Sequence, residues 1–259
     1  MQLRTAIAIS VLTCSSALAQ GTVSSKATAA INTAVGCTFS ASTTLGDPAP
    51  QSCHDIFSGA AVPVTADNFA TVMSSTIKLS NSQSLFVSPS LVTGLYTQTK
   101  TKSQPGSGPS SATAAGGVFL RAIITNQSTG AVQIGFPGAV CTPDILGCHA
   151  DSNGNFGVTL DSRVQQLTQD ISNCIVTVGT STGTCTFDLT TDLVIKTTSA
   201  HTFNFIFPNV GQGTYTVQIQ AAVNSSAITS GQASAVGAAA YGLGSLTVES
   251  VRLVHDFSF

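Results

Sequence analysis

The chain has 259 residues, of which 8% are charged, and its formal net charge is -2. An ordinary soluble domain has about 25% charged residues. The hydrophobic fraction of 42% is sufficient for a packed core and excludes disorder caused by high charge and low hydrophobicity. Because there is no basic excess to meet phosphate groups, the composition argues against nucleic-acid binding. Serine and threonine, with 33 and 35 residues, dominate the polar positions.

The N-terminal residues 1–19 have the layout of a secretory signal peptide. Arg4 precedes an apolar stretch, and an A-x-A cleavage site ends at Ala19. We therefore expect a secreted or cell-surface protein, periplasmic if the host is a Gram-negative bacterium. The alternative is a lipid anchor on Cys14, which is disfavoured because Thr13 stands where Gly, Ala or Ser is expected. No later segment has the roughly 18 consecutive apolar residues that a membrane span needs.

Six cysteines remain after removal of the leader, and an oxidising compartment favours disulfides among them. They lie in three sequence neighbourhoods, which favours three short loops: Cys37–Cys53, Cys141–Cys148 and Cys174–Cys185. Zinc binding is disfavoured because the chain has no C-x-x-C or H-x-x-x-H pair.

We expect residues 20–36 to form a flexible N-terminal arm and residues 37–259 to form one β-sandwich domain. Strands are predicted in the first half at Thr71–Leu79, Ser84–Thr99, Val118–Asn126 and Ala131–Phe136, with Pro89 marking a bulge or an edge. The segment 100–117 is rich in Pro, Gly, Ser and Ala and is predicted to be an exposed loop.

The segment from Asp151 to Asn155 carries the weak calcium candidates. Asp151, Asn153 and Asn155 present side-chain oxygens at alternate positions, as calcium-binding loops do. However, Phe156 occupies the sixth position, where such a loop has glycine, and Ser162 occupies the twelfth, where it has a bidentate carboxylate. An Asn-Gly turn leading into a strand at Asn155–Leu160 is the preferred interpretation.

A short helix is predicted at Ser162–Ile171, because Val164, Leu167 and Ile171 have spacings typical of a helical face. The following segment, Gly179-Thr180-Ser181-Thr182-Gly183, matches the G-x-S-x-G nucleophile elbow, and Asp188, His201 and His255 follow it. An elbow requires a helix after the serine, whereas Thr184–Leu189 is a strand pattern. We therefore interpret this segment, with a strand at Cys174–Gly179, as a disulfide-closed β-hairpin.

Alternating apolar residues predict two consecutive antiparallel strands over residues 202–207 and 214–221, joined by a turn-rich connection. The segment Gly213-Thr214-Tyr215 resembles the Gly-x-Tyr entry to the penultimate strand of immunoglobulin-like domains. This resemblance implies a sandwich in which the Tyr215 hydroxyl bonds back to the preceding corner. Val217 stands where that family has its cysteine, and the chain has no Trp.

Residues 231–244 have no charge and no clear period, and the sequence does not place them. A strand is predicted at Ser245–Val254, where the apolar phase changes between Val248 and Val251. A β-bulge near Glu249-Ser250 reconciles the two phases.

The remaining chemical candidates are few. Asn126 and Asn224 begin N-x-[ST] sequences and are glycosylation candidates in a eukaryotic host. The four histidines, which lie beside cysteines or at predicted strand ends, are expected in turns or on the surface: His54, His149, His201 and His255. Glycosidase chemistry needs a pair of carboxylates, and Glu249 is the one Glu beside ten Asp residues.

The fold expected from these features is all-β: an antiparallel sandwich, immunoglobulin-like or jelly-roll-like, with about 8–10 strands and at most two short helices. With five Lys and one Glu, the chain has few of the residues that usually guard sheet edges. We therefore expect a noncatalytic structural or adhesive protein without a cofactor, which self-associates or binds an extracellular glycan or protein. A glycan- or small-ligand-binding module is the alternative, followed by a secreted hydrolase.

Overall fold

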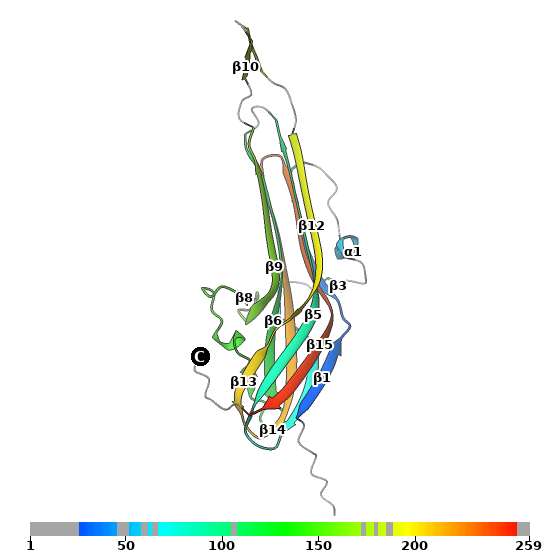
Figure 1. Cartoon of the computed structure of the whole chain (residues 1–259), viewed down its shortest axis with the longest axis vertical. Coiled ribbons are helices and arrows are strands. Elements are labelled where there is room, and N and C mark those ends of the chain that lie inside the picture. The colour runs from blue at the N-terminus through cyan, green and yellow to red at the C-terminus, as the bar shows by residue number, and fades with distance from the viewer. Residues whose placement is uncertain are drawn as a thin grey trace, which may run out of the picture.

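The protein forms an elongated sandwich of two β-sheets, seen in a computed structural model (Figure 1). The structure describes residues 26–45, 52–57, 62–63, 67–104, 108–171, 175–178, 181–184 and 189–252. Of residues 62–63, 175–178 and 181–184 only the backbone is described. The predicted signal peptide, residues 1–19, lies outside the described residues. Within the described ranges, no helix is both long enough and apolar enough to cross a membrane.

The first sheet contains seven strands in the order β12-β5-β15-β2-β3, and β1 and β13 attach to β15 and β5. Their bounds are β1 (Ala27–Asn32), β2 (Gly36–Thr43), β3 (Val62–Pro63), β5 (Gln83–Ser103), β12 (Leu189–Thr202), β13 (Phe205–Val210) and β15 (Ala233–Val251). All pairings are antiparallel except that of β2 with β3. Because β5 and β15 run the full length of the sheet, each is paired by two successive strands along one edge.

The second sheet contains six strands in the order β4-β14-β6-β9-β8, and β7 attaches to β6. Their bounds are β4 (Ala70–Leu79), β6 (Ser110–Asn126), β7 (Val132–Ile134), β8 (Cys148–Ala150), β9 (Phe156–Gln169) and β14 (Gly213–Ser230). The strands β10 (Ile175–Val178) and β11 (Ser181–Thr184) form a separate hairpin. The helical elements described are the single turn α1 (Cys53–Ile56) and the 3-10 turn η1 (Gly138–Val140).

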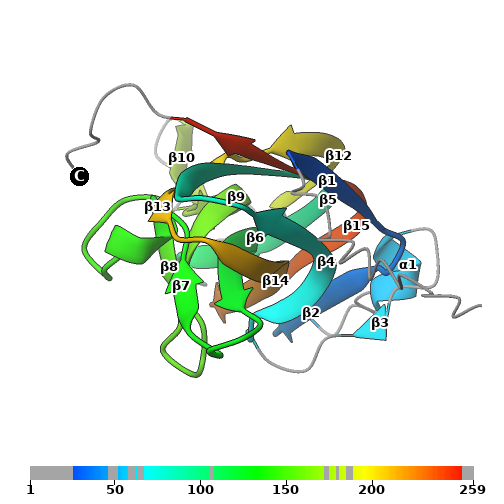
Figure 2. The same ribbon diagram turned by 90° about the horizontal axis from the view of Figure 1, so that it is seen from below.

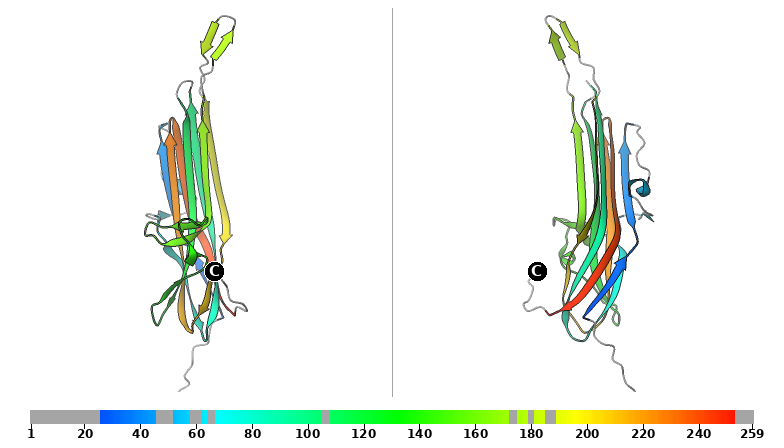
Figure 3. Two further views of the ribbon diagram at one scale, coloured as in Figure 1. Left: turned by 90° about the vertical axis from the view of Figure 1, so that its left-hand side faces the viewer. Right: turned by 45° about the vertical axis from the view of Figure 1, so that its right-hand side comes forward.

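Several connections between successive strands cross from one sheet to the other (Figure 3). β4 and β5, β5 and β6, β13 and β14, and β14 and β15 are all connected in this way. The prediction of two consecutive strands here is confirmed, but the first, β13, begins at Phe205 and continues through the expected connection to Val210. They do not form a hairpin, however, because β13 pairs with β5 while β14 pairs with β4 and β6.

The hydrophobic core fills the lower half of the sandwich, the half that contains β1 and β13 (Figure 1). β4 and β7 belong to the same half, because they pair with the first residues of β14 and the last residues of β6. Its largest fully buried side chains include Phe205, Phe207, Ile77, Leu91 and Leu120. The alternating residues of β14 contribute Tyr215, Val217 and Ile219, as the sequence predicts. The Tyr215 hydroxyl donates a hydrogen bond to the Gly211 carbonyl at 3.0 Å. The corner contact implied by the immunoglobulin resemblance is therefore present.

The predicted antiparallel β-sandwich is confirmed, but the described part contains more strands than expected, fifteen instead of about 8–10. The strands without a predicted counterpart include β1 in the lower half and β2 and β12 in the upper half, which also contains β9. End-on, Figure 2 shows the two sheets facing each other with α1 outside the first sheet.

The expected helix at Ser162–Ile171 is wrong, because residues up to Gln169 belong to strand β9. β9 pairs with β6 from Ser110 to Leu120. Its inward positions include the polar Gln165, while Val164 points outward and is 73% exposed. The hydrogen bonds of β9 with β6 thus determine the structure of this segment, although the spacing of three apolar residues favours a helix.

The expected loop at 100–117 is also wrong, since β5 continues to Ser103 and β6 begins at Ser110. Small residues suit these strand ends because Ala112 and Ala114 pack against Ala233 and Ala235 between the sheets. The segment 231–244, which the sequence does not place, accordingly lies largely within β15.

Three smaller expectations need correction. Residues 27–32 of the supposed arm 20–36 form β1 and pair with β15, so the sandwich begins before Cys37. The irregularity in β15 lies between Tyr241 and Gly244 instead of at Glu249-Ser250. Pro89 lies in a strand paired on both sides, at the point where β12 ends and β13 begins. There the Phe203 N–H donates to the Pro89 carbonyl at 3.1 Å, and Pro89 has no N–H with which to return a second bond.

Candidate interaction surface

One side of the upper half is joined by polar side chains instead of apolar ones. The Thr97 hydroxyl of β5 donates to Oε1 of Gln165 on β9 at 2.7 Å. Nε2 of Gln165 donates to Oγ1 of Thr99 at 2.7 Å and to the carbonyl of Leu193 on β12 at 2.8 Å. Since Thr97, Thr99 and Gln165 are buried, these hydrogen bonds satisfy groups that would otherwise be costly to bury. Gln165 thereby links β5, β9 and β12.

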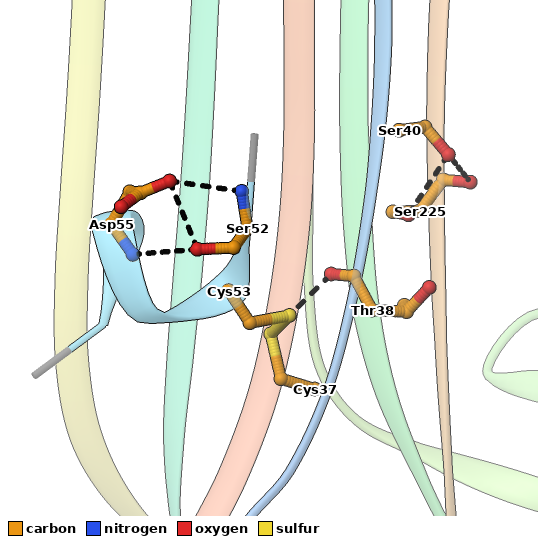
Figure 4. Close-up of a disulfide and its surroundings, with 7 residues drawn as sticks. All are labelled: Cys37, Thr38, Ser40, Ser52, Cys53, Asp55 and Ser225. Atoms are coloured by element: carbon orange, nitrogen blue, oxygen red, sulfur yellow. Dashed lines mark hydrogen bonds between the residues drawn. A yellow bond between two sulfur atoms is a disulfide. The ribbon is translucent and has the colours of Figure 1, made fainter. Parts of the chain in front are cut away.

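The opposite side of the upper half is closed by hydroxyl contacts between β2 and β14. Ser40 donates to the carbonyl of Ser225 at 3.0 Å (Figure 4). The hydroxyls of Ser42 and Thr229 lie 2.7 Å apart. Thr44 donates to the carbonyl of Gly231 at 2.6 Å. These bonds join the two sheets directly along this side.

Between these two sides the sheets approach each other closely. A Cβ added to Gly237 would lie 2.2 Å from the carbonyl oxygen of Ala115 and 2.5 Å from that of Ser226. A Cβ added to Gly116 would lie 2.6 Å from the carbonyl oxygen of Ala238. The small residues of β6 and β15 therefore bring the two sheets into backbone contact.

Within the described part of the chain, β12 forms one outer edge of the first sheet in the upper half. β12 lies at the end of the first sheet, and its 14 residues are mostly exposed. Leu193, Val194 and Ile195 are 43%, 52% and 37% exposed, although all three are large and apolar. A long, exposed and apolar edge strand offers unpaired backbone groups and apolar side chains to another strand. Sequence reasoning missed β12; the run of β-branched residues from Thr190 to Thr198 is the signal that could have found it.

Two charged residues, Asp192 and Lys196, occupy the outer face of β12. Nε2 of Gln98 donates to both carboxylate oxygens of Asp192, at 3.2 and 3.3 Å. The ammonium group of Lys196 lies 5.8 Å from the ring centre of Phe57. Burial, with a smaller contribution from the Asp192 charge, raises the pKa of Tyr96 above its ordinary value. The carboxylate of Asp192 therefore accepts hydrogen bonds from Gln98 and disfavours ionisation of Tyr96, both on the outer face of the sheet.

The predicted disulfides Cys37–Cys53 and Cys141–Cys148 are confirmed. The first ties α1 to β2, with 6.2 Å between the Cα atoms (Figure 4). The α1 turn itself has a capping box in which Ser52 and Asp55 bond to each other's backbone. The second closes the loop between η1 and β8. Cys174 and Cys185 lie outside the described residues.

The segment with the calcium candidates forms a hydrogen-bonded turn. Oδ1 of Asp151 accepts from the backbone N–H groups of Asn153 and Asn155, at 2.9 and 2.7 Å. Its Oδ2 accepts from the Phe69 N–H and from Nδ2 of Asn155. Burial raises the pKa of Asp151, but these hydrogen bonds together outweigh burial and hold it below its ordinary value. The carboxylate thus serves to fix the loop, and Asn153 turns its amide nitrogen toward Asn68.

The two glycosylation candidates differ in their surroundings. Asn126 ends β6, and its Oδ1 accepts from the backbone and the hydroxyl of Ser128 in a turn. Asn224 lies within β14, and its Nδ2, the atom that would carry a glycan, donates to Oδ2 of Asp67 at 2.8 Å. That carboxylate oxygen also contacts His149 at 2.7 Å.

The G-x-S-x-G segment is a β-hairpin, as predicted, because β10 pairs with β11 and Ser181 begins β11. Asp188, His255 and the side chain of Ser181 lie outside the described residues. His201 lies instead on β12 beside Ser199, at 2.7 Å, and Asp161, at 3.4 Å, and both contacts involve its Nε2. A nucleophile relay places the serine and the carboxylate on opposite ring nitrogens, so these three residues do not have that geometry.

The other two described histidines, His54 and His149, occupy ordinary structural positions. His54 is exposed on α1, whereas His149 stacks on Phe119 with 3.5 Å between ring centres and 8° between ring planes. Among the described residues, no group of three or more His, Cys, Asp or Glu side chains could hold a metal ion.

No protein-family model matches the sequence, and no curated protein matches it. Among solved structures, the chain is similar to that of the infectious bursal disease virus Gx strain, with 14% identity and a TM-score of 0.23. The match covers 88% of this chain and 42% of that chain. For the Gt strain of the same virus the identity is 15% and the TM-score 0.13, with 89% and 42% covered. This chain thus spans less than half of those chains, and the TM-scores are too low to carry an argument.

Proposed function

We propose that this protein is an exported, noncatalytic structural or adhesive component that associates through the open strand edges of its sandwich. The observation that carries the proposal is the exposed apolar edge of β12, which has 14 residues. The two disulfides agree with an oxidising compartment. The leader-like residues 1–19 support export.

The composition supports the same proposal. Strand edges in soluble β proteins are commonly guarded by Lys, Pro, bulges or inward-pointing charges. β12 pairs with β5 without a register shift from Leu189 to Thr202, so no bulge turns its edge away. Its polar residues are mainly Thr and Ser, which tolerate a neighbouring strand. The edge is therefore suited to association.

The test is to express the full chain in a secretory host and to measure its mass by light scattering across a range of concentrations. Binding to cells and to extracellular matrix is measured in parallel. Concentration-dependent growth in mass, or saturable binding to matrix, supports the proposal. A strictly monomeric protein that binds neither cells nor matrix would refute it.

A glycan- or small-ligand-binding module remains the second candidate because of one hollow on the outer face of the first sheet. Its volume is about 170 Å³, and Phe57, Gly94, Lys196 and Tyr241 are among its lining residues. Burial raises the pKa of Tyr241 above its ordinary value. Screening on a glycan array, with Phe57→Ala as the variant that opens the hollow, separates this candidate from the first.

A further inference from the structure

The sequence of β12 is self-complementary about Val194. In an antiparallel pair of identical strands, residues equally distant from the centre face each other. With Val194 at the centre, Leu193 of each copy faces Ile195 of the other. Asp192 of each copy then faces Lys196 of the other. In this register, apolar residues face apolar residues, and two pairs of opposite charges face each other.

We propose that the free edge of β12 pairs antiparallel with β12 of a second copy, with the two-fold axis at Val194. The inference rests on the proposed function, and it identifies the partner and the register. The first sheets of the two copies become one continuous sheet. Such a contact is isologous and closes after two copies.

The side chains of β12 lie on the faces that this pairing requires. Asp192 contacts Gln98 and Lys196 lies over Phe57, so both belong to the outer face of the first sheet. Val194 belongs to the same face because side chains alternate along a strand. Thr197, which accepts a hydrogen bond from Arg163 of β9, marks the inner face. Leu193 and Ile195 also belong to this inner face. Across the two-fold axis, Leu193 of one copy lies opposite Ile195 of the other.

The neighbours of Asp192 and Lys196 within one copy are compatible with the pairing of two β12 strands. Asp192 lies opposite Lys100 in the pairing of β12 with β5, and Lys196 lies opposite Tyr96. In the pair of copies, Asp192 would have a cation on each side. Lys196 would gain a carboxylate opposite it, in addition to the ring of Phe57. Opposite charges directly across two antiparallel strands stabilise their pairing, and like charges weaken it.

Charge reversal provides the first test. Asp192→Lys alone and Lys196→Asp alone each place like charges opposite one another twice, and we expect each to weaken association about tenfold or more. The double variant restores both pairs in reverse and recovers association. An equimolar mixture of the two single variants forms heterodimers, because every facing pair is then opposite in charge. Sedimentation equilibrium at low salt measures all four, and thermal unfolding checks that each variant is folded.

Cysteine cross-linking provides the second test. Val194→Cys places two thiols opposite each other, at a Cα separation compatible with a disulfide. In the control Thr190→Cys, the two thiols are eight residues out of register, or about 27 Å apart. Mild oxidation is followed by non-reducing electrophoresis, with the unaltered chain as background. We expect a covalent dimer from Val194→Cys and none above background from Thr190→Cys.

The outcomes separate this inference from the proposed function. If the chain associates but the charge variants behave alike and both cysteine variants cross-link equally, the β12 register is wrong and the proposed function stands. If Lys196→Asp increases association, Lys196 guards the edge and the inference is overturned. If the unaltered chain stays monomeric, Val194→Cys does not cross-link and no matrix is bound, both proposals fail.

Discussion

Gln165 is the residue whose replacement best tests the polar joint of the upper half. Gln165→Ala removes three hydrogen bonds, to Thr97, Thr99 and the Leu193 carbonyl. At about 1 kcal/mol for each bond, and with partners left unsatisfied, we expect a loss of roughly 3–4 kcal/mol. That is a large part of the 5–15 kcal/mol that stabilises a typical domain.

For a chain of this size the loss corresponds to a fall in melting temperature of roughly 6–16 °C. The matched control is Gln166→Ala, because Gln166 is the next residue on β9 and is exposed. Urea unfolding gives the free energy, and hydrogen exchange reports whether β12 loses protection first, as the bond to Leu193 implies. Equal stability of the two alanine variants would show that the buried network contributes nothing and would refute this reasoning.

Three further predictions test other parts of the fold by urea or thermal unfolding. Tyr215→Phe removes the hydrogen bond to the Gly211 carbonyl and should cost about 1 kcal/mol, with unchanged near-ultraviolet spectra. Gly237→Ala places a Cβ against two carbonyl oxygens and should cost about 1–3 kcal/mol. Its control is Gly211→Ala, whose Cβ would lie 3.8 Å from the Tyr215 hydroxyl, an ordinary contact distance. Equal effects of the two changes would contradict the close approach of the sheets. The lowered pKa of Asp151 gives stability that is complete above the unfolded value of about 3.9 and is lost as pH falls through the folded value. Asp151→Asn should therefore be destabilised at pH 7 and differ little from the unaltered chain near pH 2, and a constant difference would contradict this account.

The lower half of the sandwich was predictable because its strands have one apolar face. Tyr215, Val217 and Ile219 alternate with polar residues, and all three are buried. The tyrosine corner and the two described disulfides were also predictable, since each depends on residues close together in the sequence. The partner of each strand was not predictable, because crossing between the sheets leaves no local mark in the sequence.

The upper half was not predictable because its interior lacks the usual contrast between apolar and polar residues. Its buried positions include Ala112, Thr97 and Gln165, while Val164 and Val194 are exposed. Residues 100–117 therefore had the composition of a loop, and 162–171 had a helical spacing. These segments form β-strands because they pair with long neighbouring strands. A search for periodic apolar residues within one segment does not detect such pairing.

Because the chain has few charged residues, uncharged polar groups both join its sheets and line its outer strands. Hydroxyl and amide groups join the sheets in the upper half by short hydrogen bonds, between buried partners on one side and half-buried partners on the other. The same residue types on an outer strand leave its edge open, because they neither repel another strand nor occupy its backbone positions. On β12 the two charges, Asp192 and Lys196, stand on one face with Val194 midway between them. In the proposed pair of copies, the register centred on Val194 forms two opposite-charge pairs, which the neighbouring registers lack, so the charges would favour that register.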